Sequence, residues 1–207
     1  MRLHHELMIS RFHYTLEKAF GSSNGAIKLV GFYQGSMLWH EVEVPKIRQQ
    51  ENGSFIETDE IETLPHRPDA FFALHFPTRS GEEKTQFYFY EADRKTTSIK
   101  KMQKKLRAHF HYIVKQKRHV EEYGVNSIRA VLVESLFNQW TENLLTSARH
   151  SIVSGGKLST LFWFTPSEQA FEKLTTARVK SAEKMVPLYL EKPELVLMKI
   201  WATPLAT

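Results

Sequence analysis

Apolar positions recur first with helical spacing and then with the spacing of strands. Residues 3 to about 20 place Ile9, Phe12 and Leu16 on one face, which predicts an amphipathic helix that packs against a sheet. Gly21 and the polar residues after it end that helix. Two apolar segments follow at 26–33 and 37–44, separated by Gln34-Gly35-Ser36, whose turn chemistry predicts a hairpin.

The next part of the chain combines an irregular segment with a pair of strands and a long helix. We expect Pro45 to close the preceding strand and 45–67, which is polar and partly acidic, to form a surface loop or short β excursion. Apolar segments around 70–74 and 85–93 predict two strands that pair as a hairpin across the break at 78–81. A helix is predicted from about 97 to 118.

The remaining segments alternate between strand and helix. Strands are predicted at 128–133, 160–165 and 195–201, and helices at 138–152 and 167–182. Ser167 is the expected cap residue of the last helix. Helix, antiparallel strands, then alternating strands and helices predict an α/β fold with a central mixed β-sheet flanked by helices.

Composition narrows the class of protein. The 207 residues, 42% of them hydrophobic, fit a single domain spanning 1–207. The chain contains no cysteine, so it forms neither disulfides nor thiolate metal sites. No apolar segment approaches the roughly 20 residues of a membrane helix. We therefore expect a cytoplasmic protein with no membrane partner.

Charge is concentrated in the predicted 97–118 helix and the residues just before it. No acidic residue lies between Asp93 and Glu121, while this interval supplies ten of the chain's 28 lysines and arginines. The remaining 18 basic residues face 23 acidic ones, so the positive charge is local. Local positive charge beside carboxylates favours a polyanionic substrate. A solvated amphipathic helix covering an ordinary sheet accounts for the same composition.

Acidic residues stand at the ends of the two strands predicted to pair before this helix. Asp69 begins one, and Glu91 and Asp93 end the other, so pairing would bring their carboxylates together. Oxygen ligands of this kind suit a hard cation such as Mg²⁺ or Mn²⁺, which activates water for phosphodiester hydrolysis. A lysine beside them would polarise the attacked phosphate or the water, and Lys105 is the best-placed one. Lys101 and Lys104 compete for that role.

These residues resemble the PD-(D/E)XK nuclease superfamily, in the variant whose lysine lies on the following helix. More narrowly, the chain resembles the replication-relaxation family of plasmid and mobile-element proteins. The matching motifs, in chain order, are His5-Glu6-Leu7, Trp39, Pro68-Asp69-Ala70, Glu91-Ala92-Asp93-Arg94, Thr96, Lys105-Leu106, the segment from Phe162 to Ser167, and Trp201.

The resemblance implies a restriction-endonuclease-like core and a DNA-acting protein, an endonuclease or nickase of plasmid replication or relaxation. Asp69 and Glu91 would bind the Mg²⁺ or Mn²⁺, and Asp93 and Lys105 would complete the catalytic set. The DNA backbone would be held by Lys100, Lys101, Lys104, Arg107 and Lys115. Replication or transfer proteins of a plasmid are further expected partners.

The chain departs from the family in two respects. Members often carry a winged-helix DNA-binding region ahead of the opening helix, and none precedes residue 1, so we expect a fragment or a protein without its own targeting module. His109 stands where an aromatic residue is usual. Two alternatives stay open: a catalytically inactive accessory protein that keeps the fold and binds DNA or a partner, and an interaction module whose basic helix faces an acidic protein.

Several other residues are expected to be structural. Trp39, Trp163 and Trp201 are interpreted as core residues, and His5 as a core histidine on the apolar face of the first helix. Glu6 beside it is a further candidate ligand. His109 and His111 do not form a chelate, because neighbours two apart on a helix point in different directions.

Overall fold

The protein is built on a mixed sheet of five strands. The computed structural model describes residues 2–21, 27–77, 81–95, 97–155 and 160–166. The sheet has the order β1-β4-β5-β6-β7, in which β1, β4 and β5 are antiparallel and β6 and β7 continue parallel to β5. Its strands are β1 (Lys28–Tyr33), β4 (Ala70–Pro77), β5 (Glu83–Asp93), β6 (Ile128–Ser135) and β7 (Phe162–Pro166). The α/β prediction with a mixed sheet is confirmed.

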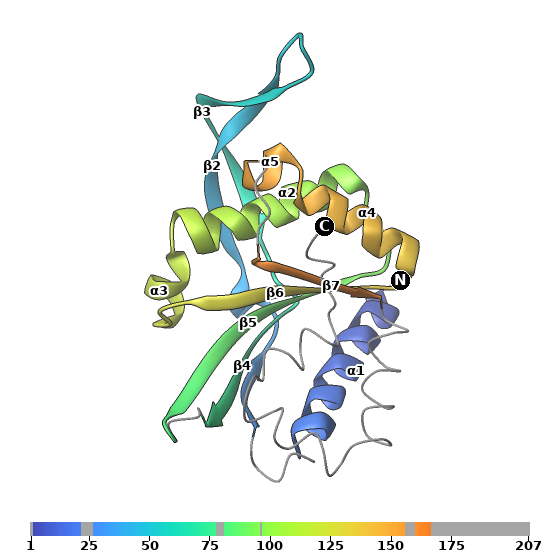
Figure 1. The fold of residues 1–207 in the computed structure, drawn as a ribbon, viewed down its shortest axis with the longest axis vertical. Coiled ribbons are helices and arrows are strands. Elements are labelled where there is room, and N and C mark those ends of the chain that lie inside the picture. Colours follow the sequence, from blue (N-terminus) through green and yellow to red (C-terminus); the bar gives the residue numbers. More distant parts are fainter. Residues whose placement is uncertain (1, 22–26, 78–80, 96, 156–159, 167–207) are drawn as a thin grey trace.

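Helices cover both faces of this sheet (Figure 1). One face carries α1 (Arg2–Gly21), and the other carries α2 (Ile99–Phe110) and α4 (Asn138–Ala148). The connection from β5 to β6 runs through α2, a π-helical turn (His111–Lys115) and α3 (Arg118–Tyr123). The connection from β6 to β7 contains α4 and α5 (Ser151–Ser154). Parallel strands require crossovers of this length.

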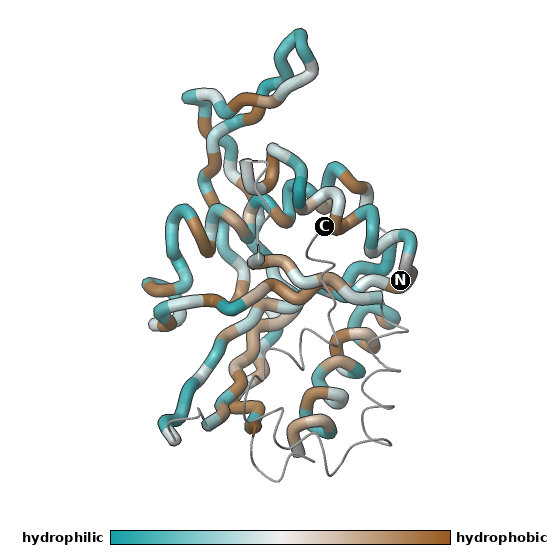
Figure 2. Tube along the Cα trace, viewed as in Figure 1, coloured by the Kyte–Doolittle hydropathy of each residue, from teal (hydrophilic) through white to brown (hydrophobic). Residues whose placement is uncertain are grey.

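Alternation along the strands divides the core into two layers. Phe72, Tyr88 and Tyr90 face α1, whereas Phe71 and Phe89 face α2. The central strands are apolar on both faces, and hydrophobic (brown) segments run through the middle of the molecule in Figure 2. Each fully buried large apolar side chain contributes about 1.5–3 kcal/mol of burial free energy. This sheet is therefore the rigid platform for the residues at its ends.

A long two-stranded ribbon occupies the segment 45–67, for which a surface loop or a short β excursion is predicted. β2 (His40–Gln49) pairs with β3 (Phe55–His66) in a separate antiparallel sheet that projects beyond the helices (Figure 1). The predicted pairing of 26–33 with 37–44 is wrong: β1 pairs with β4, and a short 3₁₀ turn (Ser36–Leu38) leads into the ribbon. Pro45 lies inside β2, at a bulge in a ribbon where both strands are edges.

Three further boundaries differ from prediction. The α-helical part of the basic helix ends at Phe110 and is followed by the π turn. Lys117, with a φ of 53°, ends this helical segment. The predicted 138–152 helix is divided at Arg149 and His150 into α4 and α5. The predicted helix at 167–182 and strand at 195–201 lie outside the described residues.

The tryptophans do not share one environment. Trp163 is buried, as predicted, but Trp39 is 53% exposed and packs under the Arg67 guanidinium. Trp201 lies outside the described residues. Within the described part of the chain, the helices lack the length and apolar content that crossing a bilayer requires.

Candidate functional site: a buried carboxylate and lysine cluster

The β4–β5 hairpin brings Asp69 and Glu91 to the same end of the sheet. Ala70 pairs with Tyr90, and the Asp69 amide donates to the Tyr90 carbonyl at 3.0 Å. The Asp69 carboxylate (Oδ2) accepts from the Ala92 amide at 2.8 Å, which fixes it beside β5. Asp69 stands before the first residue of β4 and Glu91 near the last of β5, so antiparallel pairing alone places them together.

Lys105 reaches this pair from α2. The helix begins at Ile99, after Ser98 caps its first turn by accepting from the Lys101 amide at 3.3 Å. Two turns further on, Lys105 Nζ contacts the Glu91 carboxylate and lies 3.8 Å from Asp69 Oδ2. The side chain of Glu91 is 1% exposed, and that of Lys105 is 30% exposed. The ammonium thus spans both carboxylates and keeps contact with solvent.

Charge and burial act in opposite directions on the ionisable groups. Burial raises the pKa of Asp69, but the Lys105 ammonium and the hydrogen bond with His5 outweigh it and bring the pKa to about 2. Burial also raises the pKa of Glu91 well above its usual value, against the pull of Lys105. Burial lowers the pKa of Lys105, and the two carboxylates reverse this and raise it. The lysine therefore stays charged.

Asp93 lies one step further along β5, on the same face as Glu91. Its side chain is buried and accepts a hydrogen bond from the indole nitrogen of Trp140 on α4. Burial raises its pKa, with the Trp140 hydrogen bond opposing. Asp93 is thus oriented toward α4, and it interacts with the Lys105 charge electrostatically. Nothing in the sequence indicated that Trp140 belongs to the site, since Asp93, its hydrogen-bond partner, lies 47 residues away.

His5 from α1 closes the opposite side of the cluster. Its Nε2 lies 3.3 Å from Asp69 Oδ2, and its side chain is 31% exposed. The hydrogen bond with Asp69 raises its pKa despite partial burial. The interpretation of His5 as a core histidine is wrong, because its side chain is partly exposed and pairs with Asp69 at the end of the sheet. Glu6 is exposed on the same helix.

Two buried histidines lie behind Glu91. His109 Nε2 is 2.6 Å from Glu91 Oε1, and His109 Nδ1 is 2.9 Å from His66 Nε2. Burial lowers the pKa of His109 to about 3, with the Lys105 charge adding to the effect. His109 follows Lys105 by four residues, so both lie on one face of α2. That spacing is the sequence feature that could have identified His109 as a site residue. No feature of the sequence indicated His66.

The predicted phosphate-binding residues fall into two groups. Lys100, Lys101 and Lys104 are exposed on α2, and Lys115 is exposed in the π turn. Arg107 is placed differently: its side chain is 4% exposed and donates to Glu62 at 2.8 Å and to the Pro45 carbonyl. Arg107 therefore joins α2 to the ribbon. The exposed positive surface comprises Lys115 and the first half of α2, in which Lys104 also pairs with Glu62 at 3.6 Å.

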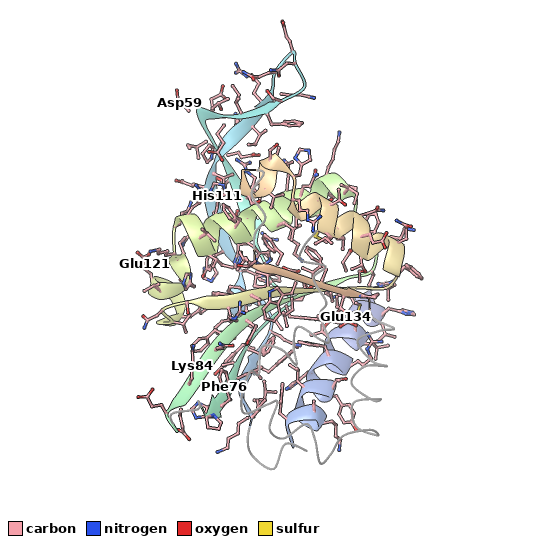
Figure 3. All side chains as sticks on the ribbon, in the orientation of Figure 1. Asp59, Phe76, Lys84, His111, Glu121 and Glu134 are labelled. Atoms are coloured by element: carbon pink, nitrogen blue, oxygen red, sulfur yellow. The ribbon has the colours of Figure 1, made fainter. Side chains whose placement is uncertain are left out.

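A further buried carboxylate lies on the α1 face of the same sheet end. Glu134, labelled in Figure 3, accepts from the Tyr90 hydroxyl at 2.7 Å and pairs with Arg11 of α1. Strand alternation keeps it on the face opposite Glu91. It ties α1 to the sheet and thereby holds His5 near Asp69.

The donor set suits a cation bound by two carboxylates. Among the described residues, no group of three or more His, Cys, Asp or Glu side chains is arranged to hold a metal ion. The Asp69 and Glu91 carboxyl groups interact directly, and Glu91 Oε2 has no hydrogen-bond partner besides its ionic contact with Lys105. Mg²⁺ is often held by one or two carboxylates, with water and substrate phosphates as the other ligands. The two residues fit that mode.

The fold and site together define an α/β protein with a buried, lysine-bridged carboxylate pair at the end of a mixed sheet. Comparison with known proteins finds no family model, no curated protein and no solved structure that matches this chain.

Proposed function

We propose that the protein acts on DNA as a metal-dependent endonuclease or nickase with a restriction-endonuclease-like core. The observation that carries the proposal is the convergence of Asp69, Glu91 and Lys105 from three different elements on one point. The core would comprise α1, the three antiparallel strands, α2 on the other face, and β6. A role in plasmid or mobile-element replication or relaxation rests on the motif resemblance.

The site contributes to phosphodiester hydrolysis through three kinds of residue. Asp69 and Glu91 would hold Mg²⁺ or Mn²⁺, which when bound neutralises phosphate charge and activates water. Lys105, charged and partly open to solvent, polarises the attacked phosphate or positions the water. Asp93, held by Trp140, keeps the lysine and the end of β5 in place.

The lysines of α2 would hold the DNA backbone beside the site. Lys100, Lys101 and Lys104 are exposed and lie on the helix that carries Lys105. Contacts of this kind release counterions, so affinity falls steeply with salt. An interaction module facing an acidic protein would lack such salt-dependent DNA binding.

A nicking assay with matched variants tests the proposal. Supercoiled plasmid is incubated with Mn²⁺ or Mg²⁺ and wild type, Glu91→Gln or Lys105→Met, and metal binding is followed by calorimetry. Glu121→Gln, at an exposed acid on α3, is the control. We expect nicking by wild type and the control, and loss of at least about 100-fold in both site variants. Intact plasmid and no heat of Mn²⁺ binding in wild type would refute the nuclease proposal.

One observation favours a second candidate. Lys105 Nζ contacts both carboxylates, so an ammonium already supplies the charge that a metal would bring. A catalytically inactive nuclease-fold protein that binds DNA or a plasmid replication protein would have this arrangement. Salt-dependent DNA binding without nicking at any metal concentration would identify it.

A further inference from the structure

Glu91 is in contact with buried polar side chains other than Asp69 and Lys105. His66 and His109 are each 1% exposed, and they form a continuous hydrogen-bonded row with Glu91. Burying two imidazoles costs free energy unless their nitrogen atoms find partners. Their placement therefore calls for a role at the carboxylate that they reach.

The row is anchored from two separate elements. His109 is on α2, one turn beyond Lys105, whereas His66 is the last residue of β3 in the ribbon. The His66 ring stacks on Tyr112 with centroids 3.9 Å apart and an interplanar angle of 5°, and its edge meets Phe89. These contacts leave His66 little freedom to rotate. The base of the ribbon thus supports the site from behind.

The hydrogen-bond partners determine the direction of donation. If His109 Nε2–H donates to Glu91 Oε1, then His109 Nδ1 accepts from His66 Nε2–H, and the partnerless His66 Nδ1 is an acceptor. The reverse direction would leave a buried His66 Nδ1–H without an acceptor, and orphaned buried N–H groups are rare. The Lys105 ammonium at Glu91 Oε2 also favours a carboxylate. Each imidazole therefore carries its proton on Nε2.

We propose that His109, supported by His66, is a positioning residue that fixes Glu91 Oε1 and directs Oε2 toward Lys105 and the metal. Without this donor, the glutamate side chain could rotate about its terminal bonds and lose its relation to Asp69. The inference rests on the proposed function, because it assigns Glu91 as a metal ligand. It also makes the ribbon, through His66, a part of the site.

Variants at the two histidines test this role. His109→Leu removes the donor, and His109→Gln keeps an N–H donor of similar reach. His66→Leu removes only the support. We expect Mn²⁺ affinity, measured by calorimetry, to fall about 10–100-fold in His109→Leu, the usual range for groups that orient metal ligands. His109→Gln should recover most of it, and His66→Leu should fall between.

A purely structural role predicts a different outcome. His109→Leu would then unfold at lower temperature, yet its folded fraction would bind Mn²⁺ and nick plasmid as wild type does, and His109→Gln would give no rescue. Thermal unfolding by circular dichroism defines the folded fraction at the assay temperature. Equal Mn²⁺ affinity in folded wild type and His109→Leu would overturn the proposal.

A measurement without metal or DNA separates this proposal from the proposed function. The ring ¹⁵N shifts of wild type should show both His66 and His109 as Nε2–H tautomers, and His66→Leu should change the His109 nitrogens. An Nδ1–H tautomer at His109 would overturn the positioning role even if the protein nicks DNA. A wild type that binds no Mn²⁺ would remove the metal function, while the expected tautomers would leave His109 as the residue that orients Glu91.

Discussion

Lys105 stands between two carboxylates that burial alone would drive toward their neutral forms. Its ammonium holds the pKa of Asp69 at about 2 and counteracts the burial of Glu91. Replacing it by methionine keeps the side-chain volume and leaves both acids without their cation. The site therefore predicts an effect on stability that is separate from any effect on catalysis.

We expect Lys105→Met to lower the free energy of unfolding by about 3 kcal/mol, the lower part of the range for breaking a buried ion pair, because the lysine is partly exposed. Urea denaturation at pH 7.5 with chelator measures it. Adding Glu91→Gln removes the buried acid that has lost its cation, so the double variant should be more stable than Lys105→Met alone. Equal stability of the two variants would contradict the ion-pair interpretation.

The buried histidines predict acid sensitivity. Burial lowers the pKa of His66, His109 and His119, so each binds fewer protons in the fold than in the unfolded chain, where its pKa is about 6.5. The unfolded chain then binds more protons through these groups, which lowers stability as pH decreases by at most about 1.4 kcal/mol per pH unit for each group. His5, Glu91 and Asp93 have raised pKa values and act oppositely, since their contributions to stability are present at low pH and lost as pH rises.

Urea denaturation at a series of pH values from 7.5 to 5 measures this slope. His119→Gln is the matched test, because His119 is buried away from the carboxylate cluster and its removal should reduce the slope while leaving the cluster intact. Equal slopes in wild type and His119→Gln would contradict the lowered pKa of the buried His119.

At the scale of elements, α2 carries two functions on two faces. Lys101 is exposed on the proposed DNA side, while Arg107 is buried against Glu62 and the Pro45 carbonyl. We expect Lys101→Met to reduce the slope of log affinity against log salt by about 0.9 and to leave stability within about 0.5 kcal/mol. Fluorescence anisotropy with labelled duplex measures the first and urea denaturation the second.

Arg107→Met should give the converse result. It leaves the Pro45 carbonyl and Glu62 without their donor, so we expect a loss of about 1–3 kcal/mol of stability and an unchanged salt slope. If Arg107→Met instead reduced the salt slope as Lys101→Met does, the buried guanidinium would have to reach DNA. The assignment of Arg107 to a structural role, distinct from that of the exposed lysines, would then be wrong.

The pairing of β4 with β5 could be predicted because its signals are local. Two apolar segments flank a break with Gly81, and their register places Asp69 beside the end of β5. The ribbon could not be predicted in the same way. Residues 34–36 have the composition of a hairpin turn, but β1 gains more by joining the mostly apolar β4 than by pairing with a polar neighbour.

The candidate site shows the same limit. Asp69, Glu91 and Lys105 follow from strand ends and helix spacing, whereas His66 lies 43 residues before His109 and meets it only because the ribbon returns beside α2. Arg107 was grouped with the lysines predicted to bind DNA, because composition does not show which face of a basic helix is covered by a second sheet. Long-range packing determines both the burial of Arg107 and the contact of His66 with His109.

The whole molecule separates its charges in space. The ribbon carries seven acidic side chains, Glu41, Glu43, Glu51, Glu57, Asp59, Glu60 and Glu62, against the basic Lys46 and Arg48. It projects beyond the helices, with Asp59 on its distal part (Figure 3), while the exposed lysines lie along α2. A polyanion approaching the ribbon is repelled and one approaching the first half of α2 is attracted. The charge pattern would therefore orient DNA on the site.

Neutralising the distal ribbon tests this orientation. We expect Glu51→Gln, Glu57→Gln and Asp59→Asn together to raise the association rate with duplex DNA about 3–10-fold at 20 mM salt and to have no effect at 500 mM, where charges are screened within a few ångströms. Stopped-flow anisotropy measures the rate. Dissociation should change less, because the ribbon repels during approach and is not part of the bound surface. A slower association would instead assign DNA contacts to the ribbon itself.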